Sequence, residues 1–535
     1  MAYTSFAFLL FLAVVVLFYY IIPKRFQWVI LLLASYAFYL TSGVKQVAFI
    51  IATTVVTYVA GLLMQKKRDA YKKELEQLGS DITKEQKRAM KKAVGAKVHT
   101  IQVLAVLINL GILAVIKYAN FVIENLNGLF TAFKWDASIP LVNIIVPLGI
   151  SFYTFQTLGY LIDVGRGKYD AERHFGRLAL FVSFFPSIVQ GPINRYDDLG
   201  AQFKAPHKFD YTTVKFGVQL MLWGLFKKLV IADRVYPMVS AIFSSSPTEH
   251  SGGVFLLGML AYALQIYTDF SGGIDIARGA AQTLGINLPQ NFERPYFSQS
   301  VAEYWRRWHA SLGGFMRDYV FYPVMLSKFV TKISKSFRGK GWKKAAKLVP
   351  SVITPFVVFF LIGIWHGASW QYVAFGLYNA IIVAGSVALD GVFKKGLELC
   401  HINTEAGSWK FFKMVRTFFV LGIAKMLVKG TGLKASLAMI GRMFTDPDFG
   451  LFLGMGGKIY EFGVDQKNMT VLLIAVLVLL TVSILQEKGM KMRETISRQN
   501  LLFRWLLYIG IIVVILVFGV YGPAYDATAF IYQAY

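Results

Sequence analysis

"VVFFLIGIWHGASWQYVAFGLYNAIIVAGSVAL", residues 357–389, carries no charged side chain and places one histidine, His366, between two tryptophans. Runs of this length and apolarity predict helices embedded in a lipid bilayer. An imidazole is costly to bury in such surroundings unless it finds a polar partner, so an ionisable side chain here is a candidate for function. The stretch therefore predicts a membrane fold with a functional polar group inside it.

Apolar stretches recur along the whole chain. Of its 535 residues, 56% are hydrophobic and 16% aromatic, which is more apolar surface than a soluble domain can bury. Because some stretches are short, the sequence predicts an all-α, polytopic membrane protein with roughly 10–13 membrane-embedded helices, some of them re-entrant. We expect one membrane domain over residues 1–535. The stretches lie at 5–22, 27–41, 46–64, 98–117, 139–161, 212–231, 253–268, 349–365, 371–391, 411–427, 470–486 and 502–520.

Positive charge is concentrated at the ends of these stretches. The formal net charge is +26, and the densest basic runs lie at 65–97 and 327–347. Because cytoplasmic loops of membrane proteins are enriched in Lys and Arg, we place both runs in the cytoplasm. Membrane lipids and a phosphate-bearing donor are better partners there than nucleic acid. Counting crossings then puts the N-terminus and the tail 521–535 outside. Run 65–97 alternates in charge sign, which predicts a solvated helical hairpin.

Motifs of several common enzyme classes are missing. The chain has one cysteine, Cys400, which rules out an internal disulfide and a metal site built on several cysteines. No HExxH, GxSxG or Walker-type lysine motif occurs. The sequence therefore predicts no metal site.

A second histidine, His309, lies in an aromatic and basic context. It belongs to "AEYWRRWHASLGGFMRDYVFYP" (302–323), in which Arg306 and Arg307 supply fixed positive charge for an anionic group. Taken alone, either histidine could be catalytic or could make a structural hydrogen bond. A neutral imidazole at His366 could accept a hydroxyl proton near neutral pH.

The segment "DFSGGID" (269–275) adds two carboxylates and a hydroxyl to an apolar region. Asp269 and Asp275 could pair with a basic group or cap a helix, or one of them could orient an imidazole or line a substrate path. The candidate substrate-binding residues are therefore Arg306, Arg307, Asp269, Ser271, Asp275 and Trp365.

Five blocks of the sequence resemble the membrane-bound O-acyltransferase superfamily, in the family's order. The two histidine blocks are "EYWRRWHASLGGFMRDYVFYPV" and "GIWHGASWQYVAFGLYNA". Blocks 147–168, 184–196 and 267–296 are similar to its branch of alginate O-acetylases and peptidoglycan O-acetyltransferases. The similarity runs from about residue 140 to the C-terminus. Segment 65–97 departs from the family pattern, as does "SGGID", where relatives often carry an aromatic residue after the first glycine.

The resemblance implies an enzyme that takes an acyl group from a cytoplasmic thioester donor, acetyl-CoA or a similar compound, and passes it to a hydroxyl. It implies catalysis by His366, with His309 in a supporting role and no further cofactor. It also implies O-acetylation of a polysaccharide at the bacterial cytoplasmic membrane, together with an extracytoplasmic SGNH-type acyltransferase or esterase as partner.

The tail "FIYQAY" (530–535) is similar to a C-terminal aromatic motif of O-acetylases in this branch. Tyr532 is either an aromatic anchor at the membrane interface or a hydroxyl that carries the acyl group as an aryl ester. Three other functions remain open: O-acetylation of peptidoglycan, D-alanyl transfer to teichoic acid from a carrier-protein thioester, and membrane transport.

Overall fold

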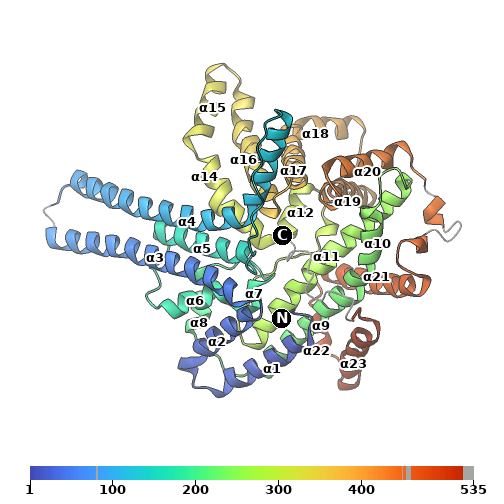
Figure 1. Ribbon diagram of the computed structural model, residues 1–535, viewed down its shortest axis with the longest axis horizontal. Helices are drawn as coiled ribbons and strands as arrows, with labels where there is room; N and C mark the ends of the chain where they lie inside the picture. Colours follow the sequence, from blue (N-terminus) through green and yellow to red (C-terminus); the bar gives the residue numbers. More distant parts are fainter. Residues whose placement is uncertain (80–81, 449, 454–458, 522–535) are drawn as a thin grey trace. The chain divides into compact units, whose positions relative to one another are not determined.

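The computed structural model describes residues 1–79, 82–448, 450–453 and 459–521. Helices dominate these ranges, and no β-strand forms in them apart from one isolated bridge between Phe292 and Trp308 (Figure 1). The all-α prediction is therefore confirmed. The helices gather into two compact units, residues 1–217 with 280–289 and residues 218–279 with 290–535. The expected single domain stays a prediction.

Unit 1 is built from the N-terminal helices, and polar side chains fix where several of them begin. The Ser5 hydroxyl accepts the Phe8 N–H at the start of the first helix, and Thr83 and Gln86 form a capping box at the start of the longest one. The unit contains α1 (Phe6–Ile21), η1 (Lys24–Phe26), α2 (Gln27–Leu40), α3 (Val44–Leu78), α4 (Lys84–Ala132), α5 (Ile150–Arg166), α6 (Phe175–Ser183), α7 (Phe185–Ile188) and α8 (Tyr196–Lys204). Helices α9 (Tyr211–Leu225) and α11 (Gly252–Thr283) have residues in both units.

The charged run 65–97 forms the adjoining ends of α3 and α4, which lie side by side (Figure 1). The two helices have 35 and 49 residues. At about 1.5 Å per residue, α4 is roughly 74 Å long, more than twice the thickness of a bilayer's hydrocarbon core. Its charged end therefore extends beyond the lipid. Its placement in the cytoplasm stays a prediction.

One predicted membrane stretch, 139–161, is helical only from Ile150 onward. Residues 139–149 form no helix because Pro140 and Pro147 lack a backbone donor and disfavour helical conformation in the residue before them. Gly149 then turns the chain with φ +69°, and a Cβ there would lie 2.0 Å from the Ile188 carbonyl oxygen. Only glycine fits this turn.

Unit 2 contains most of the remaining helices and both histidine motifs. The helices are α10 (Asp233–Ser244), α12 (Val301–Arg307), α13 (Ala310–Met316), α14 (Tyr322–Met325), α15 (Lys328–Gly339), α16 (Lys343–His366), α17 (Trp370–Ala388), α18 (Asp390–Leu399), α19 (Gly407–Lys429), α20 (Leu433–Thr445), α21 (Gln466–Glu487), α22 (Met492–Ser497) and α23 (Leu501–Phe518). Segments η2 (Phe226–Ala232) and η4 (Arg317–Phe321) are π-helical, and η3 (Pro295–Phe297) and η5 (Gly450–Leu453) are 3₁₀-helical. Cys400, directly after α18, is a free and exposed thiol.

Seven helices in the described ranges are long and apolar enough to cross a bilayer: α3, α4, α11, α16, α17, α21 and α23. Helix α23 shows why lipid is required, because only 6% of its most apolar window is buried inside the protein. Leu506, Val513 and Leu516 are among its exposed side chains. An apolar surface of this kind is stable only in contact with lipid. The chain is a multi-pass integral membrane protein.

Helices α16 and α17 form a close hairpin through two glycines. A Cβ on Gly363 would lie 2.5 Å from the Tyr372 carbonyl oxygen, and a Cβ on Gly376 would lie 2.7 Å from the Phe359 carbonyl oxygen. Both contacts are with rigid backbone atoms, so a larger residue would force the helices apart. Small residues at membrane helix interfaces permit this kind of backbone approach.

We expect Gly376→Ala to destabilise the protein by about 1–3 kcal/mol through overpacking of this hairpin. Gly385→Ala is a matched control on the same helix, because a Cβ there would meet nothing within 4 Å and alanine is the better helix former. Thermal unfolding of the detergent-purified variants checks this. A lower midpoint for Gly385→Ala than for Gly376→Ala would contradict it.

Candidate active site

His366 is the last residue of α16, and aromatic rings surround its imidazole. The imidazole centre lies 4.8 Å from the Trp365 ring centre, 6.3 Å from that of Tyr372 and 5.8 Å from that of Phe375. Gly367 follows in an extended conformation, and a Cβ there would lie 2.1 Å from the Tyr372 ring. Glycine at this position therefore lets Tyr372 pack beside the histidine.

A small cavity opens beside His366 within unit 2. It offers about 40 Å³ to water-sized groups, whereas one water needs about 10–15 Å³. It can thus hold a group of a few heavy atoms. Its walls include His366, Lys425 and mostly aromatic side chains, among them Tyr262, Tyr304, Trp305, Trp308, Tyr372 and Phe375.

His309 is almost completely buried, and its backbone adopts a left-handed conformation with φ +50°. Its Nδ1 lies 3.3 Å from Asn291 Oδ1, and its ring packs edge-on against Phe270 at 4.9 Å. Asn291 Oδ1 also accepts the Ser311 N–H at 2.8 Å, which fixes the turn around His309. Burial lowers the pKa of His309 to about 3. The imidazole is therefore neutral at physiological pH.

Trp365 links the two histidine motifs. Its ring centre lies 6.1 Å from the His309 imidazole and 4.8 Å from the His366 imidazole. The structure thus brings both predicted histidines to one aromatic cluster, although they are 57 positions apart in the sequence (366 − 309). Trp365 thus contacts both imidazoles.

The predicted acidic residues on α11 are held by two consecutive lysines of η2. Lys227 Nζ lies 2.7 Å from Asp275 Oδ2 and donates to the Ser271 hydroxyl at 2.9 Å. Lys228 Nζ lies 2.5 Å from Asp269 Oδ1 and 2.8 Å from Asp233 Oδ1, a fully buried group. The structure shows that these carboxylates pair with basic groups, which is one of the roles expected for them. A role in substrate binding stays a prediction.

Comparisons with known proteins agree with this arrangement of motifs. The family model of the membrane-bound O-acyltransferases, MBOAT, matches residues 173–338. The chain is 31% identical over 458 residues to a protein of Azotobacter vinelandii named "Probable alginate O-acetylase AlgI", an alignment that covers 84% of this chain and 79% of that relative.

The chain belongs to the membrane-bound O-acyltransferase family. It is therefore an O-acyltransferase. The peptidoglycan O-acetyltransferase of Helicobacter pylori is 27% identical, with 77% of this chain and 72% of that relative covered. A teichoic acid D-alanyltransferase of Bacillus subtilis is 32% identical over a shorter region, 45% of this chain and 59% of that relative.

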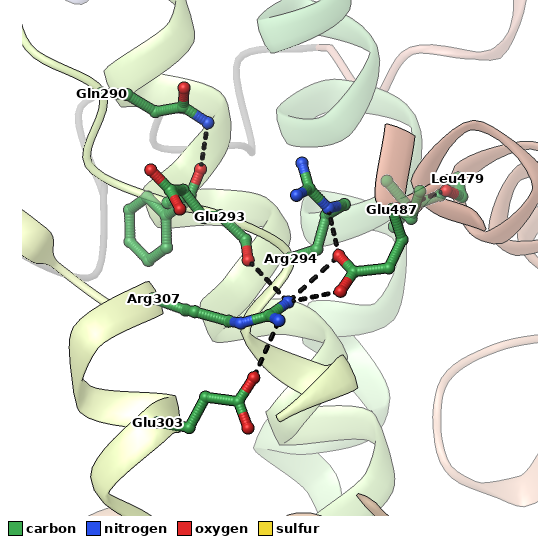
Figure 2. A network of polar contacts seen from close by, with 9 residues as sticks. Gln290, Glu293, Arg294, Glu303, Arg307, Leu479 and Glu487 are labelled. Atoms are coloured by element: carbon green, nitrogen blue, oxygen red, sulfur yellow. Dashed lines mark hydrogen bonds and ion pairs between the residues drawn. The ribbon is translucent and has the colours of Figure 1, made fainter. Parts of the chain in front are cut away.

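In this O-acyltransferase, the two predicted arginines lie in different surroundings. Arg307 contacts Glu303 at 2.7 Å and Glu487 at 2.9 Å, and Arg294 also binds Glu487 (Figure 2). Two carboxylates therefore already compensate the charge of Arg307. Arg306 is exposed and has no ion pair among the described residues. Binding of an anionic donor by either arginine stays a prediction, and Arg306 is the more available of the two.

Two predictions about the acyltransferase, on the role of Tyr532 and on the lack of a cofactor, stay predictions. Tyr532 lies beyond the described residues, so its role as carrier or anchor stays a prediction. Within the described ranges, no group of three or more His, Cys, Asp or Glu side chains could hold a metal ion. The expected lack of a metal or other cofactor also stays a prediction.

Several residues of the acyltransferase's site were not predicted from the sequence, most importantly Lys227, Lys228 and Lys425. Each stands inside an apolar stretch, "LWGLFKKLVIAD" or "VLGIAKMLVK". A charged side chain in such a stretch is itself a signal for function or pairing. Asn291 gave no such signal, because its contact with His309 depends on the fold of the loop between them.

Proposed function

We propose that this acyltransferase moves an acetyl group from acetyl-CoA, on the cytoplasmic side, to a hydroxyl of a cell-surface polysaccharide on the other side of the bacterial cytoplasmic membrane. The observation that carries the proposal is the cavity that His366 shares with Lys425, since its size suits a short acyl chain. Relatives named as alginate and peptidoglycan O-acetylating enzymes support a polysaccharide acceptor.

His366 acts as the general base in this proposal. An acceptor hydroxyl within hydrogen-bond reach of the imidazole gives up its proton as its oxygen attacks the thioester carbonyl carbon. The tetrahedral intermediate then collapses, the C–S bond breaks, and the proton passes from His366 to the leaving sulfur.

His309 supports this site from a buried position. Because its imidazole is neutral and contacts the same tryptophan as His366, it shapes the aromatic wall behind the base without adding a charge. We assign His309 and Trp365 to site geometry, and Asp269, Ser271 and Asp275 to holding η2 against α11.

The donor and the acceptor meet the protein at its two faces. Arg306 offers an exposed guanidinium for donor phosphates, with Arg307 and the basic run 327–347 nearby in sequence. On the outer side, the Tyr532 hydroxyl is the acceptor in this first transfer, and the aryl ester that forms passes the acetyl group to an SGNH-type partner. Phenols, with a pKa of about 10, are good leaving groups for the final transfer.

A reconstituted assay tests the choice of donor. Proteoliposomes containing the protein should transfer label from acetyl-labelled acetyl-CoA to a polysaccharide acceptor when an SGNH-type partner is added. They should transfer none from a D-alanyl carrier-protein thioester. Transfer of D-alanine without transfer of acetyl would replace this proposal with D-alanylation, which the partial match to a teichoic acid D-alanyltransferase makes the second candidate. Transfer of neither group would reject both.

A further inference from the structure

Lys425, on α19, is a buried lysine in an aromatic cage beside the proposed base. Its Nζ lies 4.5 Å from the ring centre of Tyr296, 5.4 Å from that of Tyr304 and 5.2 Å from that of Trp308. The ammonium also donates a hydrogen bond to the Tyr296 hydroxyl at 2.9 Å. The faces of aromatic rings attract a cation, so the cage fixes the position of the ammonium.

No carboxylate among the described residues forms an ion pair with Lys425. Lys227 and Lys228, in the same unit, each have at least one carboxylate within 2.7 Å. Burying an ammonium without a counter-charge is costly, because rings and a neutral hydroxyl replace only part of its hydration. A negative charge that forms there during the reaction would supply the missing counter-charge.

We propose that Lys425 is a catalytic residue that stabilises the oxyanion formed on the acyl carbonyl; the proposal rests on the acyl transfer proposed above. When the acceptor oxygen bonds to the carbonyl carbon, the C=O electron pair moves onto oxygen, and the ammonium of Lys425 faces that charge while His366 holds the acceptor proton. When C=O re-forms, the C–S bond breaks and the proton passes from His366 to the leaving sulfur. Lys425 keeps its own protons throughout.

The cavity makes this assignment specific. His366 and Lys425 both line it, so an acyl group inside it lies close to both an imidazole and an ammonium group. In this proposal the acyl carbonyl lies in the cavity between the imidazole and the ammonium. Apolar aromatic walls lower the local dielectric constant and so strengthen the attraction between the ammonium and a developing negative charge.

Lys425→Met tests the proposal, because methionine keeps the apolar stem of the lysine and removes the ammonium, with its charge and its hydrogen bond to Tyr296. We expect kcat to fall about 10²–10³-fold, the usual effect of losing one oxyanion-stabilising group, with the donor KM and the thermal midpoint little changed. Lys425→Arg should recover part of the loss. Lys429→Met is the matched control: Lys429 lies one turn further along α19 over Tyr236 and Tyr262 but does not line the cavity. Its kcat should stay at the wild-type value.

Three results would overturn the assignment. The first is a Lys425→Met enzyme with wild-type kcat. The second is a rise in donor KM alone, which would make Lys425 a ground-state binding residue. The third is an equal loss of kcat in Lys429→Met, which would make the effect structural. The wild-type enzyme is assayed in parallel, so failure of acyl transfer itself is seen separately as a lack of wild-type turnover.

Discussion

His366→Ala should lose about 10²–10⁴-fold in acyl transfer while the protein inserts and folds normally. The magnitude is that of general-base catalysis, because the variant removes the proton acceptor. Alanine also suits the C-terminal end of α16, so the helix should be preserved. Initial rates of labelled acetyl transfer in proteoliposomes, together with the elution profile and the thermal midpoint in detergent, measure both parts of this result.

His309→Asn is the matched variant for this experiment. Asparagine tolerates the left-handed backbone at position 309 and keeps a hydrogen-bonding side chain near Asn291, whereas the imidazole is lost. We expect this variant to retain far more activity than His366→Ala. If His309→Asn is inactive and His366→Ala keeps near wild-type turnover, the roles of the two histidines are reversed.

Lys228→Met should destabilise the protein by about 3–5 kcal/mol, the usual cost of breaking a buried ion pair by removing one partner. Its side chain and those of Asp269 and Asp233 are each 5% exposed or less. Without the ammonium, two buried carboxylates face each other. The thermal midpoint of the purified protein should fall accordingly, and expression should drop.

Two further variants separate charge from packing at this site. Asp269→Asn added to Lys228→Met removes one uncompensated carboxylate and should restore part of the lost midpoint. Lys227→Met should cost less, because Asp275 is more exposed than Asp269 and keeps Arg278 at 3.5 Å. A Lys228→Met protein as stable as the wild type would show that the buried triad contributes nothing to the folded state.

The local features of this fold could be predicted from the sequence. All seven described helices that are long and apolar enough to cross a bilayer overlap a predicted apolar stretch, because hydropathy is the main signal for entry into lipid. This prediction fails at 139–149, where apolar residues continue but Pro140 and Pro147 prevent a helix. Counting prolines and the following glycine would have placed the helix start correctly at Ile150.

Only part of the candidate site could be predicted from the sequence. His366 and His309 stood out as polar groups with motifs around them, and the fold brings them to Trp365. Lys425 meets its cage residues Tyr296, Tyr304 and Trp308 across more than 100 positions of sequence (425 − 308). These contacts depend on how α19 packs against η3 and the residues that follow it. The π-helical turn that directs Lys227 and Lys228 toward α11 likewise has no sequence signature.

The single thiol gives this protein a built-in probe of membrane sidedness. Cys400 is free and exposed and has no second cysteine beside it anywhere in the sequence. A maleimide that cannot cross lipid will label intact vesicles only when residue 400 faces the reagent. The enrichment of lysine and arginine in cytoplasmic loops also predicts that the neighbouring Lys394 and Lys395 face the cytoplasm. Labelling of inside-out and right-side-out vesicles tests this orientation in the unaltered protein.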